Sequence, residues 1–214
     1  MAFRDATAAE IDIIMDAAWQ AFQVFRETNL KQRADLMRAI AMELEATGEE
    51  LIKAAMHETH LPEARLRNER TRTQFQLTSY AEACEAGNWL EVRIDTADPA
   101  QGAPDLRKWL VPIGPVVVFG ASNFPFAYST AGGDTASALA AGCPVVVKAH
   151  SAHAETSEIV AKAISKAVEG AGLPGGVFSH VHGAGNETGR ALVMHSHARA
   201  VGFTGSFGGG KALF

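Results

Sequence analysis

Apolar residues in the first half of the chain recur three and four positions apart, the spacing that places them on one face of an α-helix. One such stripe follows Thr7-Ala8-Ala9-Glu10, whose hydroxyl and carboxylate can satisfy each other's free backbone donors as a capping box. A second capping box is predicted at Thr47-Gly48-Glu49-Glu50. A long charged helix is expected from about Pro62 towards Gly87.

Residues 89–110 follow a different pattern, in which apolar and charged positions alternate. Leu90, Val92 and Ile94 are separated by charged residues, which is typical of a half-exposed strand. Turn residues at 98–102 and a second strand at 106–110 complete a predicted β-hairpin. A hairpin that is apolar on one side only needs another surface to cover it.

From residue 111 onward, short apolar runs alternate with helical patterns. Strands are expected at 116–119, 145–147, 177–181 and 200–204, with helices at 133–141, 151–170 and 187–195 and a last one from 206. Continuous apolar runs such as Val145-Val146-Val147 are typical of strands buried on both faces. The alternation of strand and helix predicts a parallel, doubly wound α/β sheet.

Composition supports this division near residue 110. Residues 1–110 hold 32 of the 43 charged side chains but only 3 of the 20 glycines, so solvated helices are expected there and buried strands with tight turns after them. The net charge of −5 gives no electrostatic reason to bind nucleic acid or anionic lipid. Two distant cysteines make no disulfide framework, and a cytoplasmic location is expected. The uncharged run 111–133 contains Pro112, Pro115 and Pro125, which argue against a membrane-spanning helix.

Three features after predicted strands could carry chemistry. The segment 203–211 (FTGSFGGGK) combines a strand end, a glycine-rich turn and a helix start, where a phosphate is favoured; the alternative is a plain αβ turn. Lys148 ends a strand and could bond a ribose hydroxyl or a phosphate, or could be a solvated lysine. Asn123 could donate its amide to a developing oxyanion, or could belong to an Asx-turn.

Together these features resemble the NAD(P)-dependent aldehyde dehydrogenases. The resemblance is carried by 119–125 (FGASNFP), Gly183-Ala184-Gly185 with Gly189, and Phe203-Thr204-Gly205-Ser206. The segment 132–150 (GGDTASALAAGCPVVVKAH) is similar to the branch that acts on 2-oxoglutarate semialdehyde (2,5-dioxovalerate), and 58–62 and 69–73 resemble blocks of that branch too.

This resemblance implies the family's Rossmann-like cofactor domain, with N-terminal helices and a protruding β-hairpin. The implied division is an N-terminal helical part of that domain over 1–88, an oligomerisation hairpin over 89–110 and a dinucleotide-binding α/β part over 111–214. The family's nucleophilic cysteine and general-base glutamate have no match here, and the last helix would stop at Phe214. We therefore interpret the chain as the N-terminal part of a longer protein, expected to be inactive alone.

The resemblance also assigns roles to single residues. Asn123 matches the asparagine whose amide forms half of the oxyanion hole, and Lys148 matches the lysine that bonds the adenine ribose. The other implied cofactor-binding positions are Phe119, Ala121, Ser122, Ser151, Gly185, Gly189, Gly205 and Ser206. Ser122 departs from the aromatic residue that is usual at its position.

The implied function is oxidation of an aldehyde to the carboxylate with NAD(P)⁺ by a homo-oligomer. NADP is the expected cofactor, with NAD possible, because Ser151 stands where NAD-preferring members often carry a glutamate that would repel a 2′-phosphate. One alternative is a non-catalytic cofactor-binding or subunit-interaction module. Another is a glycine-rich α/β domain that binds no dinucleotide.

Neither the cysteines nor the histidines suggest a further centre. Cys84 lies in a helical pattern and Cys143 just before a buried strand, so both are expected to be buried rather than nucleophilic. His180-x-His182 and His195-x-His197 could each form a pair of ligands, but neither has an Asp or Cys beside it in the sequence. No metal site is expected.

Overall fold

A computed structural model describes residues 3–213; Met1, Ala2 and Phe214, the residue at which the last helix was expected to stop, lie outside the described residues. Its N-terminal part consists of α1 (Ala8–Phe25), α2 (Leu30–Ala46), α3 (Gly48–Thr59) and α4 (Glu63–Ala86). The capping box at Thr7 is confirmed, and Asn29 with Gln32 forms another that the sequence analysis missed.

The predicted capping box at Thr47 is wrong. The Thr47 hydroxyl donates to the carbonyl oxygen of Leu44 at 2.6 Å, one turn back, and Thr47 itself has helical backbone angles. A capping residue normally has extended backbone angles that place its side-chain oxygen over the first turn; Thr47 lacks them, and its hydroxyl makes no cap hydrogen bond to α3. The chain instead turns into α3 at Gly48, whose φ of +56° is a conformation that favours glycine.

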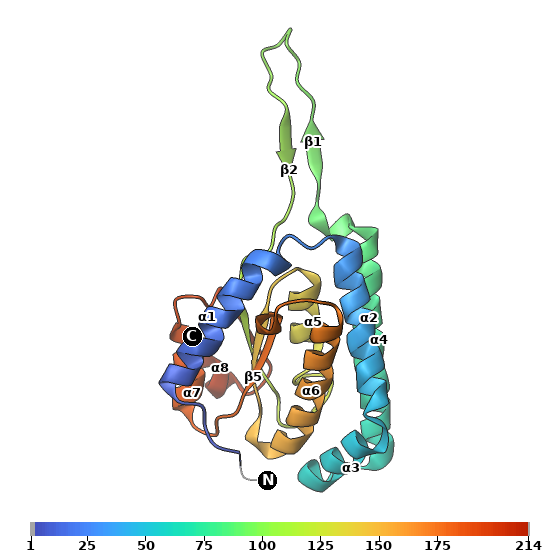
Figure 1. The fold of residues 1–214 in the computed structure, drawn as a ribbon, viewed down its shortest axis with the longest axis vertical. Helices are drawn as coiled ribbons and strands as arrows, with labels where there is room; N and C mark the ends of the chain where they lie inside the picture. Colours follow the sequence, from blue (N-terminus) through green and yellow to red (C-terminus); the bar gives the residue numbers. More distant parts are fainter. Residues whose placement is uncertain (1–2, 214) are drawn as a thin grey trace.

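The β-hairpin is confirmed, although its first strand starts later than expected. Leu90 belongs to the 3₁₀ turn η1 (Asn88–Leu90), and β1 (Arg93–Asp95) pairs antiparallel with β2 (Leu106–Lys108). The hairpin projects far from the body of the molecule (Figure 1), and Ile94 and Leu106 are each more than half exposed. It therefore presents apolar side chains to solvent rather than to the core of its own chain.

The predicted parallel α/β sheet is confirmed. Its strands are β3 (Val116–Phe119), β4 (Val145–Lys148), β5 (Phe178–Val181) and β6 (Ala200–Phe203), all parallel and in the order β5-β4-β3-β6. The connecting elements are α5 (Gly133–Ala140), η2 (Ser151–His153), α6 (Ala154–Gly170), η3 (Gly175–Val177) and α7 (Asn186–Met194), and α8 (Phe207–Leu213) follows β6.

Helices cover both faces of the sheet. Val145 and Val147 point into a core shared with α2, α4, α5 and α6, whereas Val146, between them, points to α1 and α7. The N-terminal helices are therefore packed onto the same sheet as the second half of the chain. Within residues 3–213, no helix is both long and apolar enough to cross a membrane.

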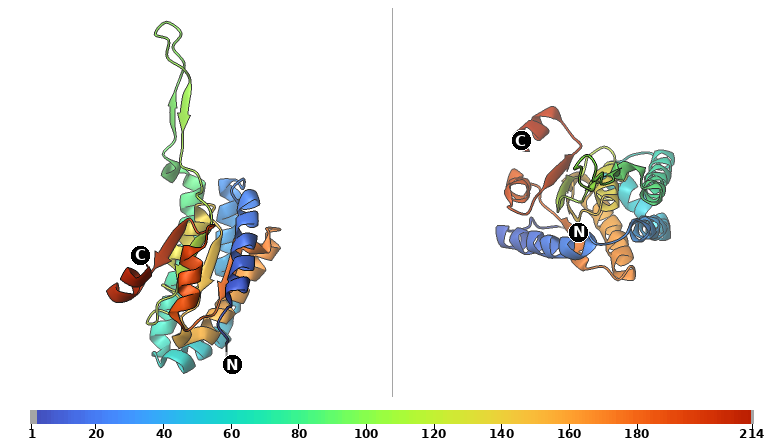
Figure 2. Two further views of the ribbon diagram at one scale, coloured as in Figure 1. Left: turned by 90° about the vertical axis from the view of Figure 1, so that its left-hand side faces the viewer. Right: turned by 90° about the horizontal axis from the view of Figure 1, so that it is seen from above.

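The last strand departs from the expectation of buried strands. Val201 is 42% exposed and Phe203 is 37% exposed, because β6 lies at the edge of the sheet with helices covering little of it. Helix α8 stands away from the body of the molecule (Figure 2), and Phe207 at its start is 86% exposed. The β6–α8 region is thus the most open part of the α/β half.

Candidate functional site

The sheet topology brings the predicted cofactor residues to the end of the sheet where the strands have their carboxyl termini. All four strands are parallel, so their carboxyl ends lie at the same end of the sheet. Phe119 ends β3, Lys148 ends β4, and Gly205 follows β6. The chain runs from β3 outward to β4 and β5, and then returns to place β6 on the other side of β3. Such a switch point is where open α/β sheets bind ligands.

The segment after β3 presents the predicted oxyanion donor. Ala121 is buried, its N–H donates to the carbonyl of Tyr128 at 2.8 Å, and its own carbonyl accepts from His153 Nε2 at 2.7 Å. The side chains of the next two residues, Ser122 and Asn123, are exposed. The backbone is thus fixed next to the exposed Asn123 amide.

His153 was not recognised as a site residue in the sequence. It is fully buried, and because a carbonyl oxygen only accepts, its Nε2 must carry the proton that bonds Ala121. Its Nδ1 lies 3.1 Å from Ser157 Oγ, which can donate to it. Both ring nitrogens are therefore occupied, and His153 joins η2 to the segment before Asn123.

Helix α4 holds the same segment from the other side. Glu69 is 5% exposed, and its Oε1 accepts from the N–H groups of Phe126 and Ala127 at 2.8 and 2.9 Å. Arg65 Nη2 donates to the carbonyl of Asn123 at 2.6 Å. Glu69 and Arg72 belong to the block 69–73 noted in the sequence, but its pattern did not predict their contacts with this segment. Positions 65, 69 and 72 share one helix face, and Arg72 bonds the Tyr128 hydroxyl at 2.5 Å.

Lys148 ends β4, and Ser151, three residues later, borders a small hollow near the ends of β4 and β5. Burial lowers the pKa of Lys148, and the nearby Asp5 carboxylate opposes that shift. Ser151 is exposed at the start of η2. The hollow is also lined by acidic side chains, Asp5, Glu58 and Glu155, that the sequence analysis did not place there.

The helix expected to begin at Ser151 begins later, at Ala154, after the 3₁₀ turn η2. Its first free N–H groups, on Glu155 and Thr156, each donate to the Glu58 carboxylate at 2.8 Å. This carboxylate already neutralises the positive end of α6. A phosphate near Ser151 would therefore gain little from the helix dipole.

Gly185 and Gly189 lie at the start of α7. The carboxylate of Asp5 accepts from the N–H groups of Ala184 and Gly185 at 2.9 and 3.4 Å. At Gly189 a Cβ atom would lie 3.1 Å from the Phe119 ring. Gly189 thus lets α7 pack closely against the end of β3, and its role in cofactor binding stays a prediction.

The turn after β6 has mainly local support. Ser206 Oγ accepts from the N–H of Gly209 at 3.1 Å, so the serine caps α8. A Cβ atom at Gly205 would lie 2.6 Å from the Phe203 ring, so a larger residue would displace that ring. The ring in turn meets Phe119 edge-on, with centroids 5.9 Å apart, across the switch point.

The burial predicted for both cysteines is confirmed. Cys84 and Cys143 are buried, and Cys84 Sγ donates to the carbonyl of Ala140 at 3.4 Å. Burial raises the pKa of the Cys84 thiol. Neither side chain has the exposed setting of a nucleophilic thiolate.

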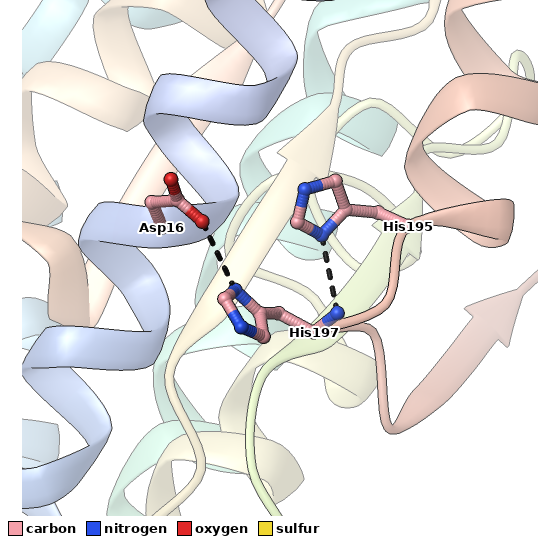
Figure 3. Close-up of side chains that lie close together, drawn as sticks. All are labelled: Asp16, His195 and His197. Carbon is pink, nitrogen blue, oxygen red and sulfur yellow. Dashed lines mark hydrogen bonds and ion pairs between the residues drawn. The ribbon is translucent and has the colours of Figure 1, made fainter.

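Each histidine pair has a carboxylate beside it in space, contrary to what the neighbouring sequence indicated. The fold brings a carboxylate to each histidine pair from a helix distant in sequence: Glu158 of α6 lies beside His180 and His182, and Asp16 of α1 beside His195 and His197. Figure 3 shows the second group, in which Asp16 Oδ1 lies 3.2 Å from His197 Nδ1.

Comparisons with known proteins agree with this architecture. The chain is 52% identical over 214 residues to alpha-ketoglutaric semialdehyde dehydrogenase 2 of Azospirillum brasilense, and 48% identical over 215 residues to alpha-ketoglutaric semialdehyde dehydrogenase of Acinetobacter baylyi. Each match covers 99% of this chain but only 41% and 40% of the relative, so the chain spans about two fifths of their length.

Solved structures share the fold. An NAD-dependent benzaldehyde dehydrogenase from Corynebacterium glutamicum superposes with a TM-score of 0.84 at 29% identity, covering 98% of this chain and 43% of that one. A glyceraldehyde-3-phosphate dehydrogenase from Methanocaldococcus jannaschii, complexed with NADP, gives a TM-score of 0.80 at 21% identity, covering 99% and 44%. The sequence model of the aldehyde dehydrogenase family matches residues 1–214. The chain therefore belongs to the aldehyde dehydrogenase family.

Proposed function

We propose that this protein takes part in oxidising 2-oxoglutarate semialdehyde, or a closely related aldehyde, to the carboxylate with NAD(P)⁺. The observation that carries the proposal is the 52% and 48% identity to two enzymes named for that semialdehyde, over nearly the whole chain. Because the chain covers about two fifths of those enzymes, the activity is proposed for the protein at its natural length.

Asn123 has the clearest chemical role in this proposal. Attack on an aldehyde carbonyl places negative charge on its oxygen, and a fixed N–H donor directed at that oxygen stabilises the transition state. The exposed Asn123 amide belongs to a backbone segment, residues 121–127, that is bonded to His153, Arg65 and Glu69. Little reorganisation of that segment is then needed as the charge develops.

The residues at the carboxyl ends of the strands fit a dinucleotide. Lys148 can bond the adenine ribose, and Gly205 and Ser206 can lie against the pyrophosphate, on either side of the switch point between β3 and β6. When bound, the nicotinamide cofactor accepts the hydride. Phe119 and Ser122 would line the cofactor-binding site.

We further propose that the enzyme accepts NADP and prefers it to NAD. Lys148 supplies a positive partner for the 2′-phosphate, and the neutral Ser151 does not repel it. Asp5 and Glu155 line the hollow that Ser151 borders and act against the phosphate. Ser151→Glu should therefore lower the ratio of kcat/KM for NADP to that for NAD, whereas Asp5→Asn should raise it. A tenfold wild-type preference for NAD would overturn the proposal.

The exposed hairpin supports a homo-oligomer. Replacing Val92 and Ile94, both more than half exposed, with charged residues should weaken assembly at natural length without changing the cofactor KM. Sedimentation of the double variant beside wild type measures this. Unchanged assembly would show that these hairpin side chains do not hold the oligomer together.

The test of the main proposal is direct. The purified protein is mixed with 2-oxoglutarate semialdehyde and NADP⁺ or NAD⁺, and reduced nicotinamide and 2-oxoglutarate are measured together. Equal amounts of both products are expected. Dinucleotide binding without turnover of any aldehyde would favour the non-catalytic alternative, and absence of dinucleotide binding would overturn both.

A further inference from the structure

Two histidines at the end of the edge strand β5 lie beside a glutamate of α6. His180 lies in β5 and His182 directly follows its last residue, and the centroids of the two rings are 4.8 Å apart. Val181, between them, points into the opposite core beneath α1. Glu158 comes from α6, which covers the face carrying the histidines, and all three ligand atoms lie within 4.8 Å of one another.

The geometry differs from that of an ordinary hydrogen-bonded pair, because one carboxylate oxygen faces both rings. Glu158 Oε2 lies 3.1 Å from His182 Nε2 and 3.5 Å from His180 Nδ1. Metal–nitrogen and metal–oxygen bonds of about 2.0–2.1 Å place the ligands of a tetrahedral zinc ion about 3.3 Å from one another. Both measured distances are within a few tenths of an ångström of that spacing.

The state of His180 also suits a metal ligand. Its side chain is only 7% exposed, and its Nδ1 is the ring nitrogen that faces Glu158. Among residues 3–213, its buried Nε2 has no hydrogen-bond partner. The ring proton can reside on that atom, which leaves the Nδ1 lone pair directed towards Glu158.

The surroundings leave room for a fourth ligand. A hollow open to solvent is lined by Phe3, Ile14 and the three residues of the cluster. The ring of Phe3 stacks on His182 with centroids 4.2 Å apart, which fixes its orientation. Lys162 approaches the other oxygen of Glu158, Oε1, at 3.7 Å, so Oε2 stays directed at the histidines.

The second histidine group lacks this convergence. There Asp16 faces His197, but His195 lies 3.6 Å from a different carboxylate, that of Asp12. The Nδ1 atom of His195 already accepts from the backbone N–H of His197 at 3.1 Å (Figure 3). These contacts form separate pairs between α1 and the segment before β6, so this group provides a matched control.

We propose that Glu158, His180 and His182 form a binding site for a divalent transition metal of the zinc class, with water as the fourth ligand. Two imidazoles and one carboxylate suit Zn²⁺, and also Co²⁺, Ni²⁺ and Cu²⁺, better than they suit Mg²⁺ or Ca²⁺. The bound ion would join α6 to the edge strand β5. Because the site forms only in the folded chain, binding would also stabilise the fold.

The experiment uses the protein at its natural length, made metal-free by dialysis against a chelator, with accessible thiols alkylated so that they do not compete. Zn²⁺ is titrated by calorimetry and Co²⁺ by its visible absorption, both without dinucleotide. We expect one ion per chain and a tetrahedral cobalt spectrum. Mg²⁺ at the same concentration should give neither signal.

Variants locate the ion. Glu158→Gln and His182→Gln should each weaken Zn²⁺ binding by at least about tenfold, whereas His197→Gln in the second group should leave it unchanged. Thermal unfolding of each variant without metal shows whether it remains folded. The proposal is overturned if no zinc binds, if binding survives both substitutions at the cluster, or if His197→Gln weakens it equally.

Discussion

The two turns that flank the switch point are built very differently. The segment after β3 is held by Arg65 and Glu69 from α4 and by His153 from η2. The turn after β6 is held chiefly by Ser206, which caps the short helix α8 that follows it, and the strand before it is partly exposed. A firmly held segment suits a group that must meet developing charge, whereas an open turn suits contact with a cofactor that enters and leaves.

The largest effect that this comparison predicts is on the oxyanion donor. Asn123→Ala should lower kcat by about 10²–10³-fold, the usual loss when one such donor is removed. Its side chain is exposed, so the melting temperature should hardly change. Steady-state kinetics and thermal unfolding of the same preparation test both halves of the prediction. A kcat within threefold of wild type would show that the Asn123 amide does not stabilise the oxyanion.

Loss of the buried carboxylate should destabilise the protein. Glu69→Ala leaves the N–H groups of Phe126 and Ala127 without their acceptor, and hydrogen bonds to a charged group contribute about 1.5–3 kcal/mol each. We expect the free energy of unfolding to fall by about 3 kcal/mol. Glu69→Gln, which keeps one acceptor oxygen, should lose about half as much in the same urea titration.

A loss below 0.5 kcal/mol for Glu69→Ala, on the order of an ordinary surface substitution, would show that α4 does not hold the segment. The control is Glu63→Ala, because Glu63 lies on the same helix but pairs with Arg67 at the surface.

The smallest effect is expected at the open turn. Ser206→Ala removes a helix cap that contributes about 1 kcal/mol, in a helix that extends away from the body of the protein. The KM for the cofactor should rise severalfold while kcat stays near wild type. Ser196→Ala, at an exposed serine outside the proposed site, is the matched control. If Ser206→Ala lowered kcat as much as Asn123→Ala does, the two turns would not have the different roles inferred for them.

The sequence predicted the residues at strand ends because that inference needs only local pattern. Apolar runs such as Val145-Val146-Val147 mark buried parallel strands, and the carboxyl ends of parallel strands necessarily meet at one edge. The resemblance to a family then supplied the roles of Asn123 and Lys148, which the pattern alone left open. The fold class and the hairpin were likewise predicted from the local pattern of apolar and polar positions.

The supporting contacts could not be predicted, because they join residues far apart in the chain. Glu69 bonds an N–H 57 positions away, and Asp5 bonds one 179 positions away. Glu158 approaches His182 across 24 positions, so neighbouring sequence gave no sign of a carboxylate there. Thr47 failed as a cap for a more local reason: its hydroxyl had a competing carbonyl one turn back.

The most direct test of the difference between the two turns is the effect of Arg65→Met on kcat and on the cofactor KM. Arg65 holds the backbone of Asn123 through one charge-assisted hydrogen bond, and its loss should lower kcat about tenfold, equivalent to about 1.4 kcal/mol, with the cofactor KM unchanged. An unchanged kcat, or an equal rise in the cofactor KM, would contradict a firmly held oxyanion donor beside an open cofactor turn.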